Sequence, residues 1–215
     1  MVIMKQNNQI EIDELQTENN FSDLKNKLEK KGYSVVIINN AEKVRKFIEQ
    51  NIPDEALVGL DGSKIINDLD IPLYLRKKWN VIVDPFQKKI AREIKDYLHE
   101  KLFESDYYIT CPDAITKDGK VVFKDKNMFL IDGKSVKPCN VIAFMEAHKI
   151  LDDIEMVQKE LRVNDLTVLE VSPFGLKRGM VDNSGQIEEY SDTPEDITEE
   201  KHLFTIVLLA EEHAY

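Results

Sequence analysis

The sequence predicts an α/β fold in which a mainly parallel sheet is flanked by helices and interrupted by an antiparallel hairpin excursion. Short β-branched or apolar runs alternate along the chain with longer segments whose apolar residues recur at helical spacing. The dipeptides Asp118-Gly119 and Asp132-Gly133 each lie between short β-rich runs, as hairpin turns do. Hydrophobic residues make up 42% of the 215 residues, which is enough for a substantial core.

The predicted helices are recognised by apolar residues that share one face. The first runs through Phe21, Leu24 and Leu28 and ends near Gly32. The second begins after the capping residue Asn40, ends before Pro53, and has an inner face of Val44, Phe47 and Ile48. The others are expected over 64–69, near 73–78, from Asp84-Pro85 onward with a buried stripe of Phe86, Ile90, Ile94, Tyr97, Leu98 and Leu102, and around Ile150, Leu151, Ile154, Val157 and Leu161.

The predicted strands are short apolar runs bounded by turn residues. They are expected over residues 34–38, 56–60, 81–83, 107–111, 121–123, 128–131, 140–145, 166–171 and 203–210. We expect the last two to pack together or at the edge of the sheet. The acidic run from Glu188 to Glu200, which lies between them, is interpreted as a solvated face or a mobile loop.

We expect one structured domain with extensions. Residues 1–18 are polar with isolated apolar side chains and are interpreted as a flexible N-terminal extension. Residues 19–215 then form a single α/β domain, in which residues 162–215 are a C-terminal elaboration.

The overall charge excludes several classes of partner. The chain has 29 Lys and Arg residues against 40 Asp and Glu residues, a formal net charge of −11. Such a surface repels phosphates, so we expect no nucleic-acid partner.

No secretory signal and no membrane-spanning run is evident, which predicts a cytoplasmic protein without membrane insertion. Cys111 and Cys139 are expected to be free thiols, and two cysteines are too few for a cysteine-ligated iron–sulfur cluster.

The junction Asp61-Gly62-Ser63 is the first candidate site. A buried strand ends there and a helix begins at Lys64, so backbone N–H groups and the helix dipole point towards a place where an anion can bind. Gly62 permits close approach of the backbone, and Ser63 adds a hydroxyl group. The alternative is an ordinary strand-to-helix turn with Ser63 as the N-cap. The charge of Asp61 opposes a bound anion unless Asp61 binds a sugar hydroxyl.

Asp113, His148 and Lys149 follow two other predicted strands, where ligands of open α/β sheets gather. Asp113 is a candidate general base, or else a turn residue that hydrogen-bonds the local backbone. His148 is a candidate for proton transfer, and Lys149 for neutralising an anionic ligand. Both are alternatively solvated residues that open the next helix.

Three stretches resemble the LUD domain of lactate-utilization proteins. They are VGLDGS at 58–63, ITCPDAITKDG at 109–119, and residues 141–151, which end in His148-Lys149-Ile150. Cys111, Asp113 and His148 stand where the family usually has Ser, Asn and Asn. The resemblance covers residues 21–161. It implies the fold of ribose-5-phosphate isomerases and CoA-transferases, and a role in the oxidation of lactate or a related 2-hydroxy acid.

Three functions are compatible with these features. The first is a LUD-like protein that binds a small anionic metabolite or nucleotide through Gly62, Ser63, Lys64 and Lys149, beside redox protein partners. The second is an independent sugar-phosphate isomerase or CoA-transferase-type enzyme, with Asp113 or His148 as acid or base. The third is a non-catalytic assembly subunit of a redox complex. The sequence identifies no cofactor and no metal site, and it leaves open whether the chain is an enzyme or forms a homo-oligomer.

Overall fold

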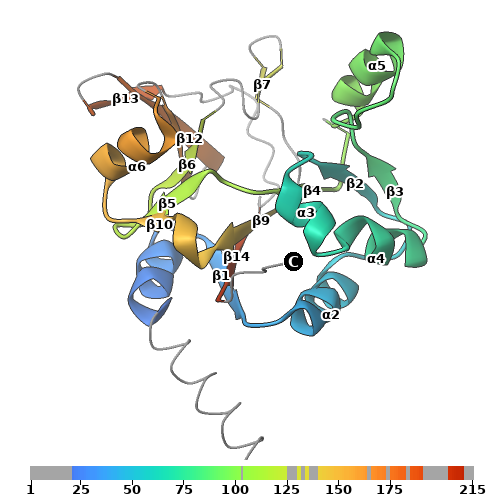
Figure 1. Cartoon of the computed structure of the whole chain (residues 1–215), viewed down its shortest axis with the longest axis horizontal. Coiled ribbons are helices and arrows are strands. Elements are labelled where there is room, and N and C mark those ends of the chain that lie inside the picture. The colour runs from blue at the N-terminus through green and yellow to red at the C-terminus, as the bar shows by residue number, and fades with distance from the viewer. Residues whose placement is uncertain are drawn as a thin grey trace, which may run out of the picture.

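The computed structural model describes residues 21–102, 104–124, 130–131, 134–135, 140–163, 166–172, 175–182, 185–190 and 203–210. Two six-stranded sheets and a separate two-stranded hairpin make up the β-structure of these residues (Figure 1). The predicted N-terminal extension, residues 1–18, and most of the acidic run 188–200 lie outside the described residues.

The first sheet is parallel throughout. Its strands are, in spatial order, β1 (Ser34–Ile38), β14 (Leu203–Leu209), β9 (Asn140–Glu146), β4 (Tyr107–Thr110), β2 (Leu57–Leu60) and β3 (Val81–Val83). Every neighbouring pair in this order is parallel. The predicted parallel sheet is therefore confirmed, and the carboxyl ends of β2, β4 and β9 meet at one edge.

Three helices cover one face of this sheet, on the lower right of Figure 1. They are α2 (Ala41–Asn51), α3 (Lys64–Asp68) and α4 (Ile71–Lys77). The predicted cap of α2 is confirmed, because Asn40 Oδ1 accepts a hydrogen bond from Lys43 N at 2.9 Å. Phe47 packs edge-on against Phe144 of β9, within a core that includes the other inward residues of α2. In the described residues, no helix has both the length and the hydropathy needed to cross a membrane.

The second sheet is mixed and packs with the other face of the first. Its strands are, in order, β10 (Ile150–Leu151), β5 (Ala114–Thr116), β6 (Val121–Phe123), β11 (Leu166–Ser172), β12 (Gly175–Val181) and β13 (Ile187–Tyr190). Only the β10–β5 pair of this sheet is parallel. Leu28, from the helical residues 21–30, joins side chains of both sheets in one buried cluster, and α6 (Ile154–Leu161) covers the outer face.

Strand β9 shows why the parallel strands read as unbroken apolar runs. Val141, Ala143 and Met145 pack towards the second sheet, whereas Ile142 and Phe144 pack towards α2, α3 and α4. Successive side chains of a strand point to opposite faces, and both faces are covered here. Burial on both faces therefore demands apolar residues at every position.

Both predicted hairpins are present. β5 and β6 are antiparallel, and Gly119 between them has a φ of 82°, a conformation that glycine adopts at little cost. β7 (Leu130–Ile131) pairs antiparallel with β8 (Lys134–Ser135), and the predicted turn residues 132–133 lie outside the described residues.

The prediction of a long helix opened by Asp84-Pro85 is wrong. Helix α5 spans Arg92–Leu102 and stands apart from the other helices in Figure 1. Asp84 Oδ1 instead accepts a hydrogen bond from Phe86 N at 3.0 Å, which forms a local turn. The predicted stripe is also largely exposed, because α5 packs on the sheet mainly through its last turns. The exposed fractions of Phe86, Ile94 and Tyr97 are 44%, 52% and 56%.

Two further predictions are corrected. Ile150 and Leu151 form β10 and not the start of a helix, because they pair with β5, and α6 begins after Asp153, whose Oδ1 caps Met156 N at 2.9 Å. The strands at 166–171 and 203–210 do not pack together or at an edge. They are β11 and β14, which are internal strands of different sheets. The sequence prediction also missed β12 and β13, because GLKRGMV and IEEY are rich in polar residues and lack a continuous apolar run.

Two phenylalanines provide a test of this packing. We expect Phe144→Ala to lower the free energy of unfolding by about 3–5 kcal/mol, because Phe144 is fully buried in the core. We expect Phe86→Ala, its control, to cost about 1 kcal/mol or less, because Phe86 is exposed and contacts His99. Urea denaturation measures both. Equal losses would contradict the exposed position of Phe86.

Candidate functional site

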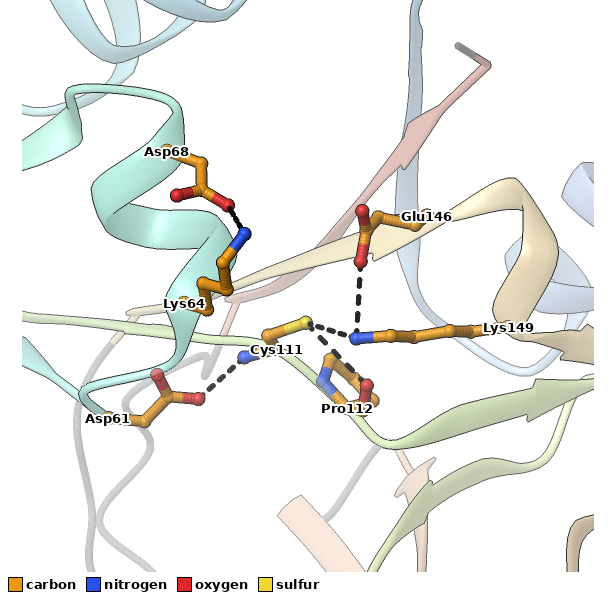
Figure 2. A network of polar contacts seen from close by, with 7 residues as sticks. All are labelled: Asp61, Lys64, Asp68, Cys111, Pro112, Glu146 and Lys149. Carbon is orange, nitrogen blue, oxygen red and sulfur yellow. Dashed lines mark hydrogen bonds and ion pairs between the residues drawn. The ribbon is translucent and has the colours of Figure 1, made fainter. Parts of the chain in front are cut away.

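The candidate site lies at the carboxyl edge of the parallel sheet. Asp61 follows β2, Cys111 follows β4, and Glu146 ends β9. The strands are in parallel register, with Leu60 opposite Ile109 and Thr110 opposite Ala143, so their ends bring these polar residues together. Figure 2 shows that Lys149 reaches into the same place from the turn after β9.

Asp61 ties two neighbouring strand ends together. Its Oδ1 accepts a hydrogen bond from Ser63 N at 2.8 Å. Its Oδ2 accepts hydrogen bonds from Thr110 Oγ1 at 2.8 Å and from Cys111 N at 2.7 Å. The Ser63 amide, which we expected to be available to a ligand, is therefore bound to a carboxylate of the protein itself. Asp61 also satisfies the Cys111 amide, a donor that would otherwise be costly to bury.

Gly62 is required by packing as well as by backbone conformation. Its φ is 73°, and a Cβ added to it would lie 2.3 Å from Cβ of Phe86. The absent side chain thus makes room for Phe86, whereas we expected it to let the backbone approach a ligand.

Ser63 and Lys64 begin α3. Ser63 occupies the N-cap position, but its side chain makes no capping hydrogen bond, and its Oγ is buried without a hydrogen-bond partner among the described residues. Lys64 is exposed, and its Nζ lies 2.7 Å from Asp68 Oδ2. The Asp68 carboxylate raises the pKa of Lys64, and Glu146 adds a smaller contribution in the same direction.

Lys149 places a partly buried positive charge in the cluster. Its Nζ lies 3.3 Å from Glu146 Oε2 and donates a hydrogen bond to Cys111 Sγ at 3.6 Å. The exposed fraction of its side chain is 30%, and that of Glu146 is 16%. Burial by itself would lower the pKa of Lys149, but the Cys111 sulfur, which is negatively charged only at high pH, and the Glu146 carboxylate outweigh it, and the pKa is raised. Lys149 is therefore an ammonium ion at neutral pH.

Cys111 is a free thiol, as expected, and it is protonated at neutral pH. Burial raises its pKa to about 12, and the nearby Lys149 ammonium only partly opposes this effect. The nucleophilic form of cysteine is the thiolate, so Cys111 is a poor nucleophile here. Because the thiol is neutral, Glu146 is the group that balances the charge of Lys149 near pH 7. Cys139 lies outside the described residues.

Asp113 and His148, the predicted acid–base residues, are not joined to this network. Asp113 Oδ2 accepts a hydrogen bond from Lys124 N at 2.7 Å, and Asp113 N donates to Val122 O at 2.9 Å, so Asp113 fixes the hairpin of β5 and β6. His148 is exposed in the turn Ala147–Lys149. Within the described part of the chain, no hydrogen bond or ion pair links either side chain to Lys149. Their catalytic roles stay predictions.

The sequence analysis missed two members of the site. Glu146 directly follows a predicted apolar strand, and its spacing of three residues from Lys149 is a signal that both follow the same strand. Thr110 falls inside a predicted strand with no assigned role, and its partner Asp61 lies 49 residues earlier in the sequence. A contact of that kind depends on strand order.

The fold and site together define an α/β protein with its polar cluster at the carboxyl edge of a parallel sheet. The model of the LUD domain matches residues 22–172, more than half of the chain, so the chain belongs to the LUD domain family. A crystal structure of a DUF162 family protein from Deinococcus radiodurans shares 9% sequence identity, with a TM-score of 0.50, over 90% of this chain and 98% of that chain. This likeness concerns the fold alone.

A crystal structure of eIF2B beta from Chaetomium thermophilum has a TM-score of 0.34 and 14% identity, over 59% of this chain and 44% of that chain. No curated protein matches the chain. Placement within the wider isomerase and CoA-transferase-like fold stays an expectation from the resemblance.

The role of Asp61 can be tested against Asp106, which joins the same two strands at their opposite ends. We expect Asp61→Asn to lower the free energy of unfolding by about 1–3 kcal/mol, because an amide N–H₂ then faces two hydrogen-bond donors. Asp106 Oδ2 accepts one bond, from Leu57 N at 2.8 Å, and is exposed. Asp106→Asn should therefore cost less than about 1 kcal/mol. Chemical denaturation measures both, and similar losses would contradict a special role for Asp61.

The protonated state of Cys111 predicts slow alkylation. With the pKa near 12, the thiolate fraction at pH 8 is roughly 2,000-fold below that of an ordinary cysteine. A more basic thiolate is also a stronger nucleophile, which increases the rate constant of the thiolate by about 40-fold. In a Cys139→Ser background, iodoacetamide should thus modify Cys111 about 50-fold more slowly than a model thiol, or slower still given its burial. Mass spectrometry over time measures this rate. Modification as fast as that of glutathione would contradict the assignment.

Proposed function

We propose that this LUD domain protein binds a small anionic metabolite at the carboxyl edge of its parallel sheet, in the oxidation of lactate or a related 2-hydroxy acid. Lys149 is the residue that holds the anion. The observation that carries the proposal is the partly buried ammonium of Lys149, 3.3 Å from Glu146 and 30% exposed. The family membership supports the link to lactate utilization.

Lys149 has capacity for a further acceptor. An ammonium group has three hydrogen-bond donors, and charge-assisted bonds to carboxylates are usually about 2.7–2.9 Å long. The 3.3 Å contact with Glu146 is longer than that, and the sulfur of Cys111 is a weak acceptor. A ligand carboxylate would form a shorter bond to this ammonium than either of its present neighbours. Partial burial strengthens such a pair relative to one in water.

The charges of the cluster favour a small monoanion over a nucleotide or sugar phosphate. The cluster contains two ammonium groups and three carboxylates (Figure 2). The ammonium groups are those of Lys64 and Lys149, and the carboxylates are those of Asp61, Asp68 and Glu146. The cluster therefore has a net charge of −1, and a phosphate with two negative charges is repelled about twice as strongly as a monoanion of the same size. The amides of Ser63 and Cys111, which could otherwise help to bind phosphate, are bound to Asp61.

The other predicted site residues have different weights in this proposal. Lys64 supplies a second positive charge, and the buried hydroxyl of Ser63 has no hydrogen-bond partner in the described part of the chain. Gly62 contributes through its packing with Phe86. Catalysis by Asp113 or His148, as in an isomerase or transferase, has less support, because Asp113 is bound to Lys124 N and His148 is exposed.

Thermal unfolding in the presence of ligands tests the proposal. L-lactate, glycolate, inorganic phosphate and AMP would each be added to the whole chain. A ligand at ten times its Kd stabilises by about 1.4 kcal/mol, which raises Tm by roughly 3–6 °C for a chain of this size. We expect this shift with the 2-hydroxy acids. It should be absent in Lys149→Met, weaker in Lys149→Arg, and retained in Lys159→Met, a matched lysine on α6.

Two results would contradict the proposal. One is the absence of any shift in the unmodified chain, which would favour the assembly-subunit function. The other is an equal shift in Lys149→Met, which would place the ligand elsewhere. A shift with AMP or phosphate alone would overturn the choice of a small monoanion.

A further inference from the structure

The two carboxylates at the ends of β2 and β9 differ in their hydrogen bonding. Asp61 accepts three hydrogen bonds at 2.7–2.8 Å from groups of the protein. Glu146 has one ion-pair partner among the described residues, Lys149, at 3.3 Å, although only 16% of its side chain is exposed. An ionised carboxylate has about four acceptor positions. Glu146 is thus a partly buried carboxylate with acceptor positions that no hydrogen bond or ion pair from the described residues fills.

The position of this capacity relative to Lys149 suggests what it recognises. Figure 2 shows the carboxylate of Glu146 pointing from β9 towards the ammonium of Lys149. A ligand carboxylate bound to that ammonium would have an oxygen about 2.8 Å from Nζ, and Glu146 Oε2 is 3.3 Å from the same atom. Groups on the carbon next to the ligand carboxylate are then within reach of Glu146. A hydrogen-bond donor there would satisfy Glu146 and separate the two negative charges.

We propose that Glu146 is a specificity-determining residue of this site, which accepts a hydrogen bond from a hydroxyl or amino group next to the ligand's carboxylate. The inference rests on the proposed function, since Lys149 must hold that carboxylate. When the ligand lacks this donor, the ligand carboxylate and Glu146 share the single ammonium of Lys149. No hydrogen bond between the ligand and Glu146 then offsets the repulsion between the two carboxylates. A site built to bind such a group discriminates against the analogue without it, because its partly buried acceptor then lacks that hydrogen bond.

Lactate and propionate provide the test, because they differ only in the hydroxyl group. Dissociation constants would be measured on the whole chain by protein-observed NMR titration, with each lactate enantiomer and with propionate. We expect at least one enantiomer to bind about 10-fold or more tightly than propionate, as a hydrogen bond to a charged group allows. In Glu146→Met this ratio should fall to about one. Glu160→Met, an exposed glutamate on α6, is the matched control and should keep the full ratio.

The outcomes separate this inference from the function on which it rests. Equal binding of lactate and propionate by the unmodified chain, lost in Lys149→Met, would overturn the role of Glu146 and leave the anion site standing. An unchanged ratio in Glu146→Met would do the same. Binding of neither acid would overturn both proposals. If Glu146→Met does not fold, Glu146→Gln replaces it: the amide oxygen is a weaker acceptor, so the ratio should fall at least about threefold, and an unchanged ratio would overturn the role.

Discussion

The carboxylate of Asp61 is the constraint on which the arrangement of this edge depends. It accepts hydrogen bonds from its own loop and from the end of the neighbouring strand β4. The bond from Cys111 N fixes the residue that follows β4, and the Cys111 thiol is thereby held next to Lys149. A feature that the sequence suggested as an obstacle to anion binding is thus a structural member of the site, and anion recognition is left to side chains further along the edge.

The parallel sheet was predictable because the residues that each of its strands requires form a continuous local pattern in the sequence. Strands buried on both faces need apolar residues at each position, so β1, β2 and β9 are evident as short runs. The cap of α2 is equally local, since Asn40 and Lys43 are three residues apart. The exposed stripe of α5 shows the limit of such patterns: helical periodicity identifies an apolar face but does not say what covers it.

The misassigned strand β10 depends on a pairing partner distant in sequence. Ile150 and Leu151 form a strand only because β5 lies beside them. The same holds within the site. Lys149 was predictable as a cation that follows a buried strand, whereas the hydrogen bond between Asp61 and Thr110 spans 49 residues and requires β2 and β4 to be neighbours. Strand order, which no local pattern encodes, therefore decides which polar residues meet.

The burial of Cys111 also determines how the site is charged. A thiolate 3.6 Å from Lys149 would neutralise the ammonium and leave little attraction for a ligand. Burial raises the pKa of the thiol to about 12, so this negative charge does not form near pH 7. Glu146 is then the one anionic group within ion-pair distance of Lys149 among the described residues. Since its carboxylate is only loosely paired at 3.3 Å, the site retains both a donor and an acceptor, and a ligand that carries the complementary pair of groups can bind to both.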